Sequence, residues 1–151
     1  MSNDVILIVD DSKFIVQAYS RVLLGLGYRV LIACDGKTGL FAAESCNPSI
    51  ILLDMHDMDD VEVLRKLKQT PSTSDIPVLA ISSLSEQNSQ KLIQEGAAGY
   101  FEKGTMTPEK LENAVSGILE GAAGYFEKGT MTPEKLENAV SEILKKRLFG
   151  F

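Results

Sequence analysis

The chain has 151 residues, of which 44% are hydrophobic and 24% are charged, and its formal net charge is −6. This is the composition of a globular domain with its own core, and the acidic balance argues against a nucleic-acid surface spread over the protein. The longest apolar runs are too short to span a bilayer, and the two cysteines and the absence of a leader pattern favour a cytoplasmic location.

Short β-branched runs alternate with helical patterns along the chain. The predicted strands are Val5–Val9, Tyr28–Ala33, Ile50–Leu53, Val78–Ile81 and Tyr100–Glu102. Apolar residues at helical spacing after Ser12 predict a first helix, and they are Phe14, Ile15, Ala18, Val22 and Leu26. Beyond an Asp35-Gly36 turn, helices are predicted at Lys37–Ser45, at Val61–Gln69, at Glu86–Glu95 after a capping Ser85, and from Thr107-Pro108 onward. This alternation implies an open parallel sheet with helices on both faces.

An internal repeat occupies the C-terminal third of the chain. Residues 95–119 and 120–144 are two copies of one segment, which differ only where Gly117 becomes Glu142. Two units are too few for a solenoid, and the rest of the chain shows no such period. We interpret the repeat as a local tandem duplication inside a single domain that covers residues 1–151.

Polar side chains follow four of the predicted strands. Asp10 and Asp11 follow the first strand, Asp54 the third, Ser82 the fourth and Lys103 the fifth. In open parallel sheets, binding and catalytic groups gather beyond the carboxyl ends of the strands. Each of these residues alone is typical of a helix cap or a solvated loop. Carboxylates brought together, however, repel one another unless a cation joins them. Their oxygens are the ligands that Mg²⁺ favours. With a lysine opposite, the combination indicates an aspartate that accepts a phosphoryl group with metal help.

Six stretches carry a family resemblance, namely ILIVDDS at 6–12, ACDGKTGL at 33–40, PSIILLDM at 48–55, VEVLRKLK at 61–68, IPVLAISS at 76–83 and AGYFEK at 98–103. With these motifs the chain resembles the receiver domain of bacterial two-component response regulators, of the stand-alone chemotaxis (CheY-like) type. The resemblance covers essentially the whole chain once one repeat copy is set aside. It implies a flavodoxin-like, three-layer α/β/α fold with parallel strand order 2-1-3-4-5, here extended by the duplicated β-α unit.

The resemblance also implies the roles of the site residues. Asp54 matches the phosphoacceptor, which takes its phosphoryl group from a sensor histidine kinase, a phosphotransfer protein or a small phosphodonor. Asp10 and Asp11 match the acidic pair that holds Mg²⁺ together with Asp54, and the backbone carbonyl of His56 matches the remaining protein ligand.

Three further positions match residues that contact the phosphoryl group or act as the switch, and one of them has both roles. Ser82 and Lys103 match the phosphoryl-binding hydroxyl and lysine, and Ser82 and Tyr100 match the switch pair. The chain departs from the family where Gly104 replaces the usual proline after the lysine, and where the loop after Asp54 is shorter than is typical. The shorter loop is expected to shift the His56 carbonyl relative to the metal.

The repeat offers alternatives for two of these residues, because Tyr125 and Lys128 in the second copy correspond to Tyr100 and Lys103. Chain continuity with the fourth helix favours the first copy in the fifth-strand position. If the second copy adds a sixth strand outside it, a right-handed crossover places the Thr107–Leu119 helix on the face of the fourth helix. Alternatively, the second copy is an appendage exchanged with a neighbouring chain, which gives a homodimer, or it fills the native position itself.

The sequence therefore predicts a phosphoacceptor that switches the binding of an unknown output protein. It is not expected to be an enzyme, to bind nucleic acid directly or to insert into a membrane. A flavodoxin is disfavoured because Asp10 and Asp11 would repel the FMN phosphate. The alternative function is a receiver-like protein-docking module that works without phosphorylation.

Overall fold

The computed structural model describes residues 4–55, 60–82, 86–102, 106–120 and 125–126. In chain order the elements are β1 (Val5–Val9), α1 (Lys13–Gly25), β2 (Arg29–Ala33), α2 (Gly36–Cys46), β3 (Ile50–Met55), α3 (Asp60–Gln69), β4 (Val78–Ser82), α4 (Glu86–Gln94), β5 (Gly99–Glu102), α5 (Pro108–Leu119) and β6 (Tyr125–Phe126). Each of the five predicted strands is present: β1 has the predicted bounds, and the other four differ from the prediction by one or two residues.

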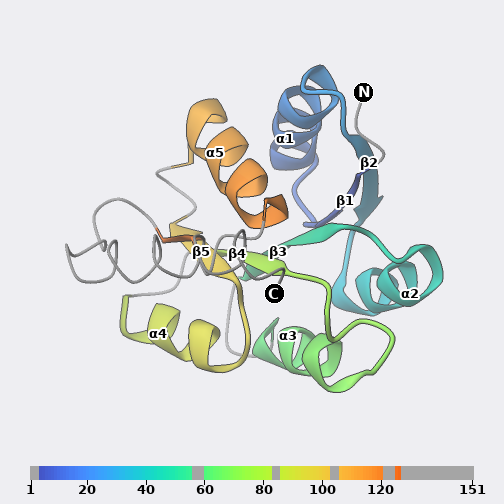
Figure 1. Ribbon diagram of the computed structural model, residues 1–151, viewed down its shortest axis with the longest axis vertical. Helices are drawn as coiled ribbons and strands as arrows, with labels where there is room; N and C mark the ends of the chain where they lie inside the picture. The colour runs from blue at the N-terminus through green and yellow to red at the C-terminus, as the bar shows by residue number, and fades with distance from the viewer. Residues whose placement is uncertain (1–3, 56–59, 83–85, 103–105, 121–124, 127–151) are drawn as a thin grey trace, which may run out of the picture.

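The strands form one parallel sheet in the order β2-β1-β3-β4-β5-β6. The first five strands have the predicted 2-1-3-4-5 order. Figure 1 shows α1 and α5 on one side of the sheet and α2, α3 and α4 on the other, which is the three-layer arrangement expected. No helix in the described part of the chain is both long and apolar enough to cross a bilayer.

The core consists of two apolar layers, one on each face of the sheet. Because successive side chains of a strand point to opposite faces, each buried strand contributes to both layers. Ile8 and Leu52 belong to the layer under α1 and α5, whereas the neighbouring Leu7 and Leu53 belong to the layer under the other three helices. Strands covered on both faces explain why their sequences are continuous apolar runs.

Side-chain caps define the start of three helices at the edge of the sheet where the strands end. The side chains of Ser12, Asp35 and Thr107 each accept a hydrogen bond from the backbone N–H three residues along, at the starts of α1, α2 and α5. The predicted turn at Asp35-Gly36 is in fact this cap and the first residue of α2. Ser85, the predicted cap of the next helix, lies outside the described residues.

The first predicted helix is present as α1. Its buried residues are Val16, Tyr19 and Leu23, whereas the side chain of Phe14 is 79% exposed. Of the residues whose spacing predicted the helix, Ile15 and Val22 are partly buried against the same apolar layer, because apolar residues occupy more than one stripe of this helix. Packing against the sheet selects the stripe that includes Tyr19.

The position of α5 also corrects a prediction. Strand β5 comes from the first repeat copy, and β6 pairs on its outer side, but α5 packs in the same layer as α1 and not beside α4. The crossover from β5 to β6 therefore has the opposite hand from the crossover between β4 and β5. The buried residues of α5 complete the layer under α1, and they are Leu111, Ala114, Val115 and Ile118. This burial outweighs the handedness preference, which has little effect on a partner strand of two residues.

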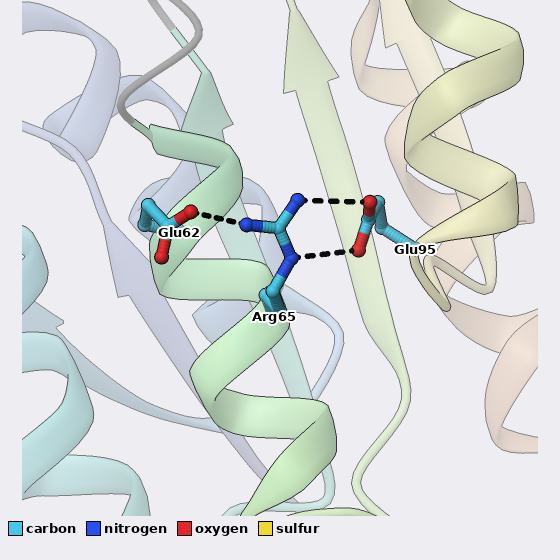
Figure 2. A network of polar contacts seen from close by, with 3 residues as sticks. All are labelled: Glu62, Arg65 and Glu95. Carbon is cyan, nitrogen blue, oxygen red and sulfur yellow. Dashed lines mark hydrogen bonds and ion pairs between the residues drawn. The ribbon is translucent and has the colours of Figure 1, made fainter.

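An arginine joins α3 to the end of α4. Arg65 donates from Nε and a terminal nitrogen to the two carboxylate oxygens of Glu95, at 3.1 and 3.0 Å, and its other terminal nitrogen pairs with Glu62 (Figure 2). The fork geometry of a guanidinium matches a carboxylate in two places at once. This contact ties the residue that begins the first repeat copy to the third helix.

Candidate functional site

The carboxyl ends of β1 and β3 present two buried aspartates. The backbone N–H of Asp10 donates to the carbonyl oxygen of Ala33 at 3.0 Å, so Asp10 continues the pairing of β1 with β2. Its side-chain Oδ1 accepts a hydrogen bond from the backbone N–H of Ser12 at 2.8 Å, which holds the carboxylate at the start of α1. Asp54 lies within β3, one residue beyond the predicted end of that strand.

Three carboxylates converge at this edge. One oxygen from each of Asp10, Asp11 and Asp54 lies within 4.8 Å of the others, and we call this group the acidic cluster. Asp10 and Asp54 are only 4% and 7% exposed, whereas Asp11 is exposed. Hard carboxylate oxygens at this spacing fit a divalent cation such as Mg²⁺, which offsets their mutual repulsion.

The acidic cluster lines a cleft of about 180 Å³. The cleft wall also includes residues that the sequence did not single out as site residues, namely Cys34, Asp35, Gly36 and Val63. A β-carbon added to Gly36 would lie 2.6 Å from Cγ2 of Val63, so the absence of a side chain there lets α2 approach α3 beside the cleft. The requirement for close approach gives this glycine a structural role at the site.

Two other predicted site residues lie in the neighbouring strands. Ser82 ends β4, is 1% exposed, and pairs with Met55, the residue after Asp54. Tyr100 in β5 is 7% exposed and packs in the layer under α2, α3 and α4. The strand order therefore brings Ser82 next to the strand that carries Asp54, whereas the Tyr100 ring is part of the apolar layer.

The remaining predicted site residues are His56, Lys103 and Lys128, which lie outside the described residues. Tyr125, the alternative switch residue, is described only as backbone, in β6 opposite Gly99.

A buried tyrosine beneath the acidic cluster was missed by the sequence prediction. Tyr19 on α1 is 7% exposed, and its hydroxyl is buried with no hydrogen-bond partner in the described structure. Burial, with smaller effects from the carboxylates of Asp10 and Asp54, raises the pKa of Tyr19 to about 12. The hydroxyl is therefore a protonated donor at neutral pH. The i, i+3, i+7 spacing of Val16, Tyr19 and Leu23 was the sequence signal for its burial.

Comparisons with known proteins agree on one family. The family described as "Response regulator receiver domain" matches residues 6–116. Response regulator PleD from Caulobacter vibrioides is 39% identical over 101 residues, which are 65% of this chain and 22% of that protein. This chain thus spans about a fifth of the length of that relative.

Solved structures show the same fold. A CheY-like receiver domain protein from Methanospirillum hungatei has a TM-score of 0.71 and 28% identity, and covers 79% of this chain and 95% of its own. The receiver domain of a sensor histidine kinase from Pseudomonas aeruginosa has a TM-score of 0.65 and 23% identity, and covers 79% and 96%. In that Pseudomonas protein a magnesium ion is coordinated in the active-site cleft.

Proposed function

Because the chain belongs to the family of response regulator receiver domains, we propose that it is a phosphoacceptor of two-component signalling whose acceptor is Asp54. The phosphoryl group comes from the phosphohistidine of a sensor histidine kinase or of a phosphotransfer protein. Phosphorylation then changes the binding of an output protein, so the chain works as a switch and not as an enzyme.

The acidic cluster is the observation that carries this proposal. A lone aspartate at the end of a strand would have little functional meaning, but three carboxylates within 4.8 Å at the edge of a parallel sheet are costly without a ligand. Asp54 is one of the two buried members, on a central strand between β1 and β4. A fixed, buried carboxylate beside a cleft is suited to in-line attack on an incoming phosphoryl group.

In the proposed reaction a carboxylate oxygen of Asp54 attacks the phosphorus atom. An O–P bond forms, the P–N bond to the donor imidazole breaks, and its electron pair stays on the imidazole nitrogen. With acetyl phosphate the bond that breaks is the P–O bond, and acetate leaves. Asp10 and Asp11 repel the incoming anion by themselves, so the reaction requires positive charge in the cleft.

We propose that Mg²⁺ supplies this charge and is held by Asp10, Asp11 and Asp54 with the backbone carbonyl of His56. When bound, it neutralises charge on the phosphoryl oxygens. The donor set of the acidic cluster supports this choice, since Mg²⁺ takes carboxylate oxygens and readily completes its shell with water and phosphate.

We further propose that Ser82 and Lys103 contact the phosphoryl group, and that Ser82 and Tyr100 transmit the change to the output face. The placement of Ser82 beside the strand of Asp54 supports the first assignment. The second repeat copy is proposed to add a β-α unit beyond β5, beginning with the β6 strand. This addition covers the outer edge of β5 and so alters the surface that an output protein meets. An exchange of this copy between two chains, which would form a homodimer, is the competing arrangement.

The phosphorylation proposal is tested with acetyl phosphate and Mg²⁺. Intact-mass measurement should show one added phosphoryl group on the parent, none on Asp54→Asn, and none on either when EDTA replaces Mg²⁺. Asp35→Asn is the matched control, because Asp35 lines the same cleft outside the acidic cluster, and asparagine caps a helix as well as aspartate. A parent that gains no mass, with either acetyl phosphate or a phosphorylated kinase, would favour a docking module instead.

The lysine assignment is tested by comparing Lys103→Ala with Lys128→Ala under the same conditions. If the first copy supplies the pocket, only Lys103→Ala slows phosphorylation strongly. Equal effects would contradict a pocket built from one copy.

A further inference from the structure

The hydroxyl of Tyr19 is a buried polar group without an evident structural purpose. The residue is 7% exposed, and the hydroxyl has no hydrogen-bond partner in the described structure. Among the residues that line the cavity beside Tyr19, Thr107 uses its hydroxyl to accept the backbone N–H of Lys110 as the cap of α5. Buried polar groups are almost always paired, so this hydroxyl calls for a partner outside the protein side chains, such as water, an ion-bound group or a ligand.

Tyr19 belongs to the apolar layer on the α1 face of the sheet, and the strand positions of this layer continue to the acidic cluster. It shares an apolar layer with Ile8 and Leu52. Because side chains of a strand alternate between faces, the next positions on that same face are Asp10, directly after β1, and Asp54, within β3. Tyr19 therefore lies in the layer on the face of the sheet that leads to these two carboxylates.

The direction of the side chain also leads toward the acidic cluster. Side chains of a helix lean toward its N-terminus, and α1 begins just after Asp10 and Asp11. The negative charges of Asp10 and Asp54 both act on the tyrosine, since both raise its pKa. The phenol thus approaches the two carboxylates from the α1 side of the sheet.

A small cavity beside the ring leaves room for adjustment. This cavity of about 90 Å³ lies between α1 and α5 and is lined by Ala18, Tyr19, Val22, Met106, Thr107, Pro108 and Leu111. Core side chains are ordinarily packed without such space, so small movements are costly elsewhere in the protein. The Tyr19 ring therefore borders open space on the side that faces the start of α5.

We propose that Tyr19 is a positioning residue of the phosphorylation site, whose hydroxyl donates a hydrogen bond to an oxygen that enters with the metal or with the phosphoryl group. The proposal rests on the proposed Mg²⁺-dependent phosphorylation of Asp54. The acceptor is an oxygen of metal-bound water or of the phosphoryl group, and both are anionic or polarised acceptors that suit a neutral phenol.

The test compares the parent, Tyr19→Phe and the matched control Tyr28→Phe. Tyr28 packs at the edge of the same apolar layer, but it directly precedes β2, at the sheet edge opposite the acidic cluster. Three quantities are measured for each protein: the thermal unfolding midpoint in EDTA, the dissociation constant for Mg²⁺ alone, and the concentration of beryllofluoride needed for half-saturation at fixed Mg²⁺. Beryllofluoride serves as the probe for the phosphoryl group.

We expect Tyr19→Phe to leave the midpoint in EDTA unchanged or higher, because it removes a hydroxyl that has no partner in that state. Binding should weaken by about tenfold, the effect of losing one hydrogen bond to a charged group. Weaker Mg²⁺ binding assigns the acceptor to metal-bound water, and weaker beryllofluoride binding alone assigns it to the phosphoryl group. Tyr28→Phe should change neither binding constant.

Two results would overturn the proposal while leaving the proposed function intact. One is a parent that binds beryllofluoride while Tyr19→Phe binds both ligands as tightly as the parent. The other is a lower unfolding midpoint in EDTA for Tyr19→Phe, which would show that the hydroxyl already has a structural partner. A parent that binds neither Mg²⁺ nor beryllofluoride overturns the proposed function and this proposal together.

Discussion

Removal of one charge from the acidic cluster should stabilise the metal-free protein. Two unit charges 4.8 Å apart repel by about 0.9 kcal/mol in water and by about 3.5 kcal/mol at the effective dielectric constant of about 20 found near protein surfaces. Asp54 faces both Asp10, which is buried, and Asp11, which is exposed and better screened. Part of the gain is offset because an amide accepts weaker hydrogen bonds than a carboxylate. We therefore expect Asp54→Asn to raise the free energy of unfolding by about 2 kcal/mol.

Urea unfolding in EDTA at low salt measures this difference, and the effect should shrink at high salt because the exposed part of the repulsion is screened. Saturating Mg²⁺ should reverse the order, since the ion stabilises the parent through a site that the variant has weakened. Glu44→Gln, at an exposed position on α2, provides the effect of removing one negative charge alone. If Asp54→Asn gains no more stability in EDTA than Glu44→Gln, the three carboxylates do not repel one another as their spacing requires.

Two further predictions concern the packing and the ion pair beside the site. Gly36→Ala should lower the free energy of unfolding by about 1–3 kcal/mol, because the new β-carbon collides with the stiff side chain of Val63. In a double-variant cycle, Val63→Ala should remove most of that loss. Gly25→Ala is the control and should not lower the stability, because its new carbon meets nothing within 4 Å. Independent effects of the Gly36 and Val63 changes would refute the contact. Because the Arg65 hydrogen bond lowers the pKa of Glu95, the stability it adds is present above the ordinary glutamate pKa and is lost as the pH falls through the lower folded value. The stability difference between parent and Glu95→Gln should therefore shrink with acidification; a difference that does not change with pH would contradict the ion pair.

The strands and the acidic cluster were predictable because each depends on a strong local pattern. Strands covered on both faces must be continuous apolar runs, and the first polar residue after each run lies at the edge of the sheet. Asp10, Asp11 and Asp54 follow from that rule and from the parallel topology. The sequence could not show that Asp10 and Asp54 are buried and Asp11 exposed, because burial at a strand end depends on the helices above it.

Tyr19 illustrates why the helix faces were harder to predict. Apolar spacing on α1 is compatible with several stripes, and only the fit to the sheet selects Val16, Tyr19 and Leu23. Periodicity also concerns the position of Cβ, whereas the hydroxyl of a tyrosine lies several bonds away. That the phenol approaches Asp10 and Asp54 depends on where α1 begins relative to β1 and β3.

The two repeat copies show whether secondary-structure propensity or tertiary contacts decide where a segment lies in the fold. Residues 95–119 and 120–144 have almost the same sequence, so helix and strand propensities cannot decide which copy supplies the strand beside β4. Connectivity and tertiary contacts do decide it: the first copy begins at Glu95, directly after α4, where Arg65 of α3 holds it. Once β5 is paired with β4, the apolar residues of α5 complete the layer under α1, even though this requires an unfavoured crossover to β6. The burial of that one helix therefore outweighs the handedness rule for the two-residue strand β6.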